Sequence, residues 1–207
     1  MNKENDKRLL RQIPNALTLG RVVLTFIFLF MLLYVNRVEN ISLHLDIAFV
    51  LFLIAALTDI VDGKVARHFN VTSKFGRIMD PLADKLLVCG AFLCFAIIGQ
   101  PKLFTLSETM LSIIHWSVFA IVTARELFVT IIRHIAESRG INFAAVASGK
   151  LKMFLQSFAI GTVMVKAAHV QGEWANYFTA AVFVAMLIST VQSGLGASKR
   201  LKPSKSE

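Results

Sequence analysis

The sequence predicts an all-α integral membrane protein with six transmembrane helices and a short N-terminal amphipathic juxtamembrane helix. Of the 207 residues, 56% are hydrophobic and 17% are charged, whereas a soluble domain carries about 25% charged residues. The apolar residues also fall in runs of about 20, the length at which a helix crosses the hydrocarbon core of a bilayer. We therefore expect residues 1–198 to form one six-span domain, followed by a basic cytoplasmic tail at 199–207.

The chain opens with a basic segment, residues 1–13, in which cationic side chains are interspersed with leucines. This pattern suits a helix that lies on an anionic membrane surface. Pro14 and Asn15 then predict a turn into the first span. The six predicted spans lie at about Ala16–Val35, Leu43–Arg67, Gly76–Ile98, Met110–His134, Ser148–His169 and Trp174–Gly194.

Positive charge is concentrated on one side of the predicted membrane. Of the 22 Lys and Arg residues, only Arg37, Lys102 and Lys166 fall on the side opposite the N-terminus, which leaves 19 on the N-terminal side. Cytoplasmic segments of membrane proteins carry such an excess, so both termini are expected in the cytoplasm. A net charge of +9 would suggest nucleic-acid binding in a soluble protein, but charges that alternate with spans argue against that class.

Four carboxylates lie beside the second and third spans as two pairs, Asp59 with Asp62 and Asp80 with Asp84. At spacings of three and four residues, each pair lies on one face of a helix. Carboxylates beside membrane-length apolar runs are unfavourable unless their charge is compensated, and a divalent cation does so because hard cations prefer oxygen ligands. Four carboxylates could hold two such ions and so clamp a pyrophosphate. Pro81 is expected either to start the third helix or to kink it.

Other side chains in the sequence suit phosphorylated ligands. Gly63 and Ala66 are small and leave room for a bulky ligand beside the helix, while Arg67 adds a fixed positive charge. A second basic cluster could bind another phosphate at a distance from the metals; its members are Arg125, Arg133, Lys150 and Lys152. Two phosphate sites indicate phosphoryl-type transfer between two phosphorylated substrates, one of them a lipid because the site opens beside hydrocarbon.

The motif around the carboxylates resembles the signature of the CDP-alcohol phosphotransferases. It reads Asp59-x-x-Asp62-Gly63-x-x-Ala66-Arg67, then eight residues, then Gly76-x-x-x-Asp80-x-x-x-Asp84. The segments IPNALTLGR, DPLADKLL, RELFVTIIR and GKLKMFLQ resemble the phosphatidylglycerophosphate synthase branch of this family. Those enzymes transfer a phosphatidyl group from CDP-diacylglycerol to glycerol 3-phosphate and release CMP.

The resemblance implies a six-span homodimer in the bacterial cytoplasmic membrane, with Mg2+ or Mn2+ in a cavity that faces the cytoplasm. It implies that Asp59, Asp62 and Asp80 bind metal, and that Asp84 joins the second metal site and acts as general base on the attacking hydroxyl. The implied contacts to the CDP moiety are Asp62, Gly63, Ala66, Arg67 and Gly76. The implied contacts to the acceptor phosphate are Arg125, Arg133, Lys150 and Lys152. Thr18 and Arg21, in the first turns of the first span, either contact the lipid headgroup or pack between helices.

Two departures from the synthase pattern concern the acceptor: Met153 replaces a common Thr, and TIIRHIAESRG replaces a TGLR-type run. Inositol phosphate or another alcohol is therefore an alternative acceptor. A cation transporter would place carboxylates near the middle of the bilayer and would show inverted repeats, but here the acids cluster at one face and no repeat is visible. A catalytically inactive scaffold is disfavoured because no motif position is missing.

Overall fold

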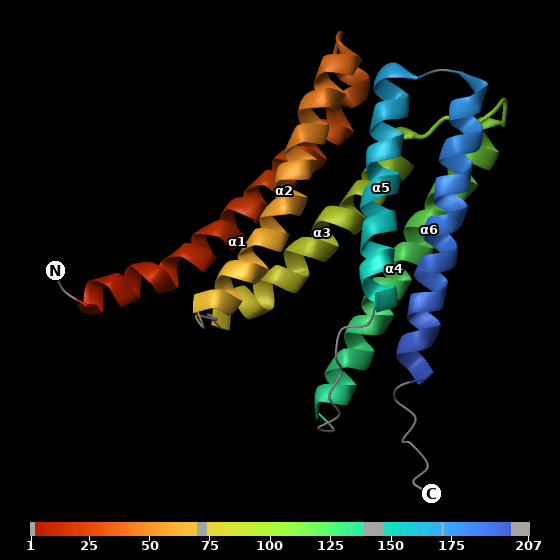
Figure 1. Ribbon diagram of the computed structural model, residues 1–207. Coiled ribbons are helices and arrows are strands. Elements are labelled where there is room, and N and C mark those ends of the chain that lie inside the picture. The colour runs from red at the N-terminus through yellow and green to blue at the C-terminus, as the bar shows by residue number, and fades with distance from the viewer. Residues whose placement is uncertain (1–2, 70–73, 139–146, 171, 200–207) are drawn as a thin grey trace, which may run out of the picture. The chain divides into compact units, whose positions relative to one another are not determined.

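The structure is a computed structural model that describes residues 3–69, 74–138, 147–170 and 172–199. Its elements in chain order are α1 (Lys3–Tyr34), the 3-10 turn η1 (Val35–Arg37), α2 (Ile41–Phe69), α3 (Lys74–Ile98), α4 (Glu108–Ser138), α5 (Ala147–His169) and α6 (Glu173–Lys199). These ranges contain no strand, which confirms the predicted all-α class (Figure 1). The predicted tail, residues 199–207, lies outside the described residues apart from Lys199.

Five of the described helices contain a segment that is long and apolar enough to cross a membrane, as expected of a multi-pass membrane protein. These segments are Thr18–Arg37, Ile41–Thr58, Pro81–Ile98, Leu151–His169 and Glu173–Ser198. The predicted fourth span falls on α4, a helix of 31 residues that is not among the five. The fourth span, and with it the total of six, therefore stays a prediction.

Two prolines, Pro14 and Pro81, lie inside helices. α1 runs through Pro14, where a turn is predicted, so the surface segment and the first span form one helix. α3 begins at Lys74, so Pro81 lies in its interior and does not start it. A proline removes one intrahelical hydrogen bond, and the remaining hydrogen bonds of a 32-residue or 25-residue helix maintain the element.

The chain divides into an N-terminal part, residues 1–94, and a C-terminal part, residues 95–207, which are described separately. In the N-terminal part α1 packs against α2, and the rings of Phe28 and Phe52 meet with centroids 5.4 Å apart. α3 approaches α1 closely at Gly90, where a Cβ atom would lie 2.7 Å from Leu29 Cδ1. The absence of a side chain at Gly90 therefore leaves room for the Leu29 side chain.

In the C-terminal part α6 packs against both α4 and α5, and Figure 1 shows α5 and α6 running side by side. Buried apolar side chains fill the space between these helices, among them Val122, Ile160, Met164 and Met186. Between membrane-spanning helices such side chains stabilise the pair through van der Waals packing, because lipid tails are as apolar as the side chains themselves.

Two helices of the C-terminal part also hold the loop that joins α3 to α4. His115 Nε2, on α4, lies 3.0 Å from the Pro101 carbonyl oxygen. Lys166 Nζ, on α5, donates a hydrogen bond to the Lys102 carbonyl oxygen. The loop backbone is thus bound by side chains from two different helices.

Candidate active site

The carboxylate motif lies on two consecutive helices, near the helix ends that adjoin residues 70–73. Asp59 and Asp62 belong to the last three turns of α2, and Asp80 and Asp84 belong to the first three turns of α3. Because both stretches are helical, each pair shares one helix face, as the spacing predicts. The fold therefore brings the motif to the ends of two long apolar helices.

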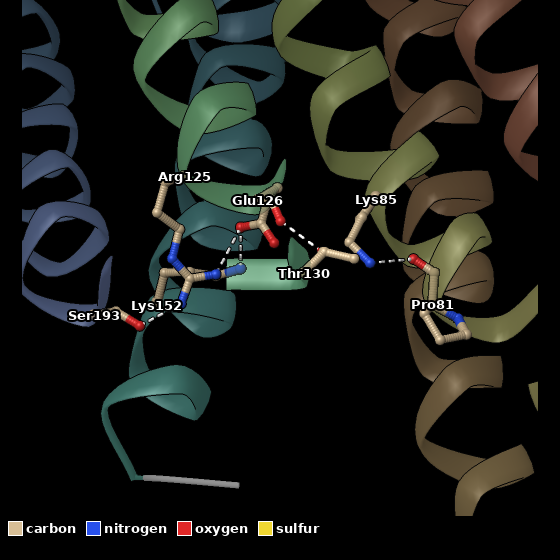
Figure 2. A network of polar contacts seen from close by, with 7 residues as sticks. All are labelled: Pro81, Lys85, Arg125, Glu126, Thr130, Lys152 and Ser193. Carbon is tan, nitrogen blue, oxygen red and sulfur yellow. Dashed lines mark hydrogen bonds and ion pairs between the residues drawn. The ribbon is translucent and has the colours of Figure 1, made fainter. Parts of the chain in front are cut away.

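Asp84 is the motif residue whose side chain the structure describes. It is half-buried, and it follows the buried Ala83 on α3. One turn earlier, the Pro81 carbonyl oxygen accepts a hydrogen bond of 3.1 Å from Lys85 Nζ (Figure 2). The other side chains of the motif lie outside the described ones, namely Asp59, Asp62, Gly63, Ala66, Arg67, Gly76 and Asp80.

The chemistry of the motif fits a hard divalent cation, since all four predicted ligands are carboxylates. Among the side chains that the structure describes, no three His, Cys, Asp or Glu residues lie close enough together to hold a metal ion. Of the four predicted ligands, only Asp84 has a side chain that the structure describes. The metal site thus stays a prediction that rests on the type and spacing of its ligands.

Thr18 and Arg21 are both buried, with 2% and 1% of their surface exposed. The Thr25 hydroxyl donates to the Arg21 carbonyl oxygen at 2.9 Å, one turn further along α1. A guanidinium in a membrane-spanning helix is unfavourable unless it faces protein or water. Both predicted roles of Thr18 and Arg21, contact with a lipid headgroup and packing between helices, therefore stay predictions.

A buried polar cluster joins three helices of the C-terminal part (Figure 2). At its centre is Glu126 of α4, whose Oε1 accepts from Lys152 Nζ at 2.5 Å and from Arg125 Nη1 at 3.1 Å. Arg125 Nη2 donates to the hydroxyl of Ser193 on α6. The side chains of Lys152, Glu126 and Arg125 are 4%, 9% and 12% exposed. We call these four residues the buried ion cluster.

The structure brings together two of the four residues predicted to bind the acceptor phosphate, Arg125 and Lys152. Arg133 lies eight residues beyond Arg125 on α4 and is exposed. In the described part of the chain, no hydrogen bond or ion pair joins Arg133 to the buried ion cluster. The side chain of Lys150 lies outside the described ones.

Sequence reasoning missed two members of this cluster, Glu126 and Ser193. A carboxylate within a membrane-length apolar run is a signal in its own right, and it could have identified Glu126. Ser193 carried no such signal, because its contact depends on how closely α6 approaches α4. A Cβ atom on the adjacent Gly194 would lie 3.4 Å from Arg125 Cγ, so the stem of Arg125 lies directly against α6.

Residues 11–191 match the family of CDP-alcohol phosphatidyltransferases. A relative from Mycobacterium tuberculosis (strain ATCC 25618 / H37Rv), named probable phosphatidylglycerophosphate synthase, is 34% identical over 149 residues, which are 72% of this chain and 64% of the relative. The chain therefore spans slightly less than two thirds of that relative's length.

Two further relatives carry the name CDP-diacylglycerol–glycerol-3-phosphate 3-phosphatidyltransferase. The one from Bacillus subtilis (strain 168) is 35% identical over 160 residues, covering 74% of this chain and 76% of the relative. The one from Rickettsia typhi (strain ATCC VR-144 / Wilmington) is 30% identical over 156 residues, covering 75% of this chain and 78% of the relative.

Proposed function

Because this chain belongs to the CDP-alcohol phosphatidyltransferase family, we propose that it transfers a phosphatidyl group from CDP-diacylglycerol to glycerol 3-phosphate. The products are phosphatidylglycerophosphate and CMP, and the reaction serves phospholipid biosynthesis. The observation that carries the proposal is the complete motif from Asp59 to Asp84, in a chain whose relatives are named for this activity. The gathering of Arg125 and Lys152 supports a phosphorylated acceptor.

The reaction exchanges one phosphorus–oxygen bond for another. A hydroxyl oxygen of glycerol 3-phosphate bonds to the phosphorus that carries diacylglycerol, and the bond between that phosphorus and the CMP oxygen breaks. An alcohol is a weak nucleophile at neutral pH, so a base must take its proton as attack proceeds. We assign this role to the carboxylate of Asp84, whose half-buried position supports contact with a water-soluble acceptor.

The residues that would hold Mg2+ or Mn2+, with two ions in each active site, are Asp59, Asp62, Asp80 and Asp84. Such ions would neutralise the pyrophosphate and make CMP a better leaving group. The CDP moiety would contact the small and basic positions of the same motif, Gly63, Ala66, Arg67 and Gly76, together with Asp62. The acceptor phosphate would bind Arg125 and Lys152, with Arg133 and Lys150 nearby in the sequence.

The asymmetry of basic residues supports an orientation with both termini and the active site at the cytoplasmic face of a bacterial cytoplasmic membrane. A soluble phosphate ester and a membrane-bound nucleotide lipid can meet at such a face. The proposal also includes the homodimer that the family resemblance implies. Chemical crosslinking of the protein in native membranes tests it, and a purely monomeric species would reject the dimer while leaving the catalytic assignment intact.

The decisive experiment is a transfer assay with purified protein in nanodiscs. CDP-diacylglycerol labelled in the cytidine is offered with glycerol 3-phosphate, inositol phosphate or glycerol in parallel, and CMP release is measured. We expect release with glycerol 3-phosphate and little with the other two. Release that depends on inositol phosphate instead would keep the chemistry and change the acceptor, and no release with any alcohol would reject the enzyme class.

Metal dependence has a test of its own. Treatment with EDTA should reduce CMP release to the background, and Mg2+ or Mn2+ should restore it, because the pyrophosphate would otherwise keep its full negative charge. Full activity after exhaustive chelation would contradict the metal assignment of the four aspartates.

A further inference from the structure

Glu126 occupies the donors that the proposed acceptor phosphate would need. Lys152 Nζ and Arg125 Nη1 both donate to the same carboxylate oxygen, Glu126 Oε1. The other terminal nitrogen of Arg125, Nη2, donates a hydrogen bond to the Ser193 hydroxyl. A phosphate oxygen that binds these two cations therefore has to share their donors with Glu126 or take them from it.

The surroundings of the buried ion cluster contain further polar atoms that could bind a polar ligand. Arg125 Nε is buried and has no hydrogen-bond partner among the described residues. Gln156, one turn beyond Lys152 on α5, is fully buried, and neither atom of its amide is paired within the same described part of the chain. Buried polar atoms normally bind protein groups or water, so this region of the C-terminal part has unused capacity for polar contacts.

The Glu126 carboxylate carries the same sign of charge as a phosphate and offers the same kind of acceptor oxygen. Arginine and lysine bind both groups through charge-assisted hydrogen bonds. In the absence of a ligand, two buried cations without a counter-charge would be strongly unfavourable. The carboxylate removes this penalty, and it does so at the atoms where a phosphate would bind.

We propose that Glu126 is a positioning residue that stands in for the acceptor phosphate in the empty site and competes with it for Lys152 and Arg125. This inference rests on the proposed function, in which those two residues bind the phosphate of glycerol 3-phosphate. During turnover the phosphate displaces the carboxylate from at least one cation. After transfer the carboxylate takes the donors back.

Such competition has a chemical use in this reaction. The phosphate of the acceptor is not consumed, because the attacking group is a hydroxyl and the phosphate stays on the lipid product. A site that bound this phosphate very tightly would retain the product. An internal carboxylate that returns to the same cations lowers the affinity for substrate and product alike, and so favours release.

The test compares Glu126→Gln with Glu108→Gln, a matched control at the exposed start of the same helix. The KM for glycerol 3-phosphate, the kcat and the inhibition constant of inorganic phosphate are measured for each. For Glu126→Gln we expect KM and the inhibition constant to fall about tenfold, equivalent to about 1.4 kcal/mol, and kcat to fall as product release slows. The control should match the original protein in all three.

Glu126→Asp provides a second variant that keeps the charge and is therefore expected to fold. Its shorter side chain reaches the two cations less well, so KM and the inhibition constant should also fall, but by less than in Glu126→Gln. An unchanged or increased inhibition constant in both variants would overturn the inference. A loss of kcat with no change in either constant would do so as well, because it would indicate a purely structural role.

Failure of the inference can be distinguished from failure of the proposed function. If the original protein releases no CMP with glycerol 3-phosphate, the proposed function fails and this inference fails with it. If the original protein turns over and the Glu126 variants bind phosphate no better, only the inference fails.

Discussion

The two parts of this molecule assemble their charged groups in different ways. In the N-terminal part the charged motif runs from Asp59 to Asp84, on two helices that follow each other directly in the chain. In the C-terminal part the buried ion cluster draws Arg125 and Glu126 from α4, Lys152 from α5 and Ser193 from α6. The first is a local pattern with a fixed spacing, and the second exists only when three helices have packed.

The two regions also differ in the sign of their charges. The aspartates of the motif all carry the same sign, and a metal ion bound among them would compensate that charge. The buried ion cluster contains both signs and satisfies much of its own charge. We therefore expect substitutions in the first region to affect the rate of the reaction and those in the second to affect stability as well.

The largest expected effect belongs to Asp84. Asp84→Asn should lower the rate of CMP release by about 10²–10⁴-fold, because the attacking hydroxyl loses its base, while CDP-diacylglycerol still binds. Asp46→Asn, at an exposed position of α2, is the control and should retain its activity. Turnover near the original rate in purified Asp84→Asn protein would remove this residue from the base role.

Lys152 should have the largest effect on stability. Lys152→Met leaves Glu126 with Arg125 alone, and breaking a buried ion pair typically costs about 3–5 kcal/mol, so we expect a loss of about 3 kcal/mol in the free energy of unfolding in detergent. Adding Glu126→Gln to this variant should deepen the loss, since Arg125 is then left without a buried counter-charge. Lys102→Met is the control, because the Lys102 side chain is exposed in the loop before α4. It should change the free energy of unfolding by less than about 0.5 kcal/mol.

A smaller loss is expected for Ser193→Ala, which removes the acceptor of the hydrogen bond from Arg125 Nη2. Hydrogen bonds to charged groups contribute about 1.5–3 kcal/mol, and we expect the lower value because Arg125 keeps its contact with Glu126. Ser198→Ala is the control, since among the described residues that hydroxyl donates within α6, to the Leu195 carbonyl oxygen. Equal unfolding free energies for the two variants would contradict the importance of the contact between α4 and α6.

The smallest effect concerns the close approach of α3 and α1. In Gly90→Ala the new methyl group would meet Leu29 Cδ1 at 2.7 Å, so Leu29 must move, and overpacking of this kind costs about 1–3 kcal/mol. The higher helix propensity of alanine offsets up to about 1 kcal/mol, so we expect a net loss of about 1 kcal/mol. Gly20→Ala is the control, because nothing lies within 4 Å of its new methyl group. A further change of Leu29 to Ala should relieve the clash.

Much of the fold was predictable because it depends on apolar runs. Five of the six predicted spans end within a few residues of the observed helices, and α5 ends at His169 as expected. The error concerns Pro14, which lies inside α1 where a turn is predicted. Pro81 lies inside α3, which excludes a start of the helix at that residue and leaves the predicted kink. A local preference for a turn is weak beside the hydrogen bonds that a buried helix forms on either side of it.

The candidate site was predictable only where its members are close in the sequence. The spacing of the aspartates is a property of one helix at a time, so a reader of the sequence can place each pair on one face. That Lys152 contacts Glu126, and that Arg133 does not join them, depends on the rotation of α4 and α5 relative to each other. No periodicity within a single helix encodes that rotation.

The C-terminal part has polar contacts between its elements at two separate levels. Along α4 the loop contact of His115 and the cluster contact of Arg125 are about 15 Å apart, and along α5 Lys166 and Lys152 are about 21 Å apart. A slide of α5 past α4 by one helical turn would break contacts at both levels at once. These two levels of contact therefore oppose a sliding motion of α5 along α4.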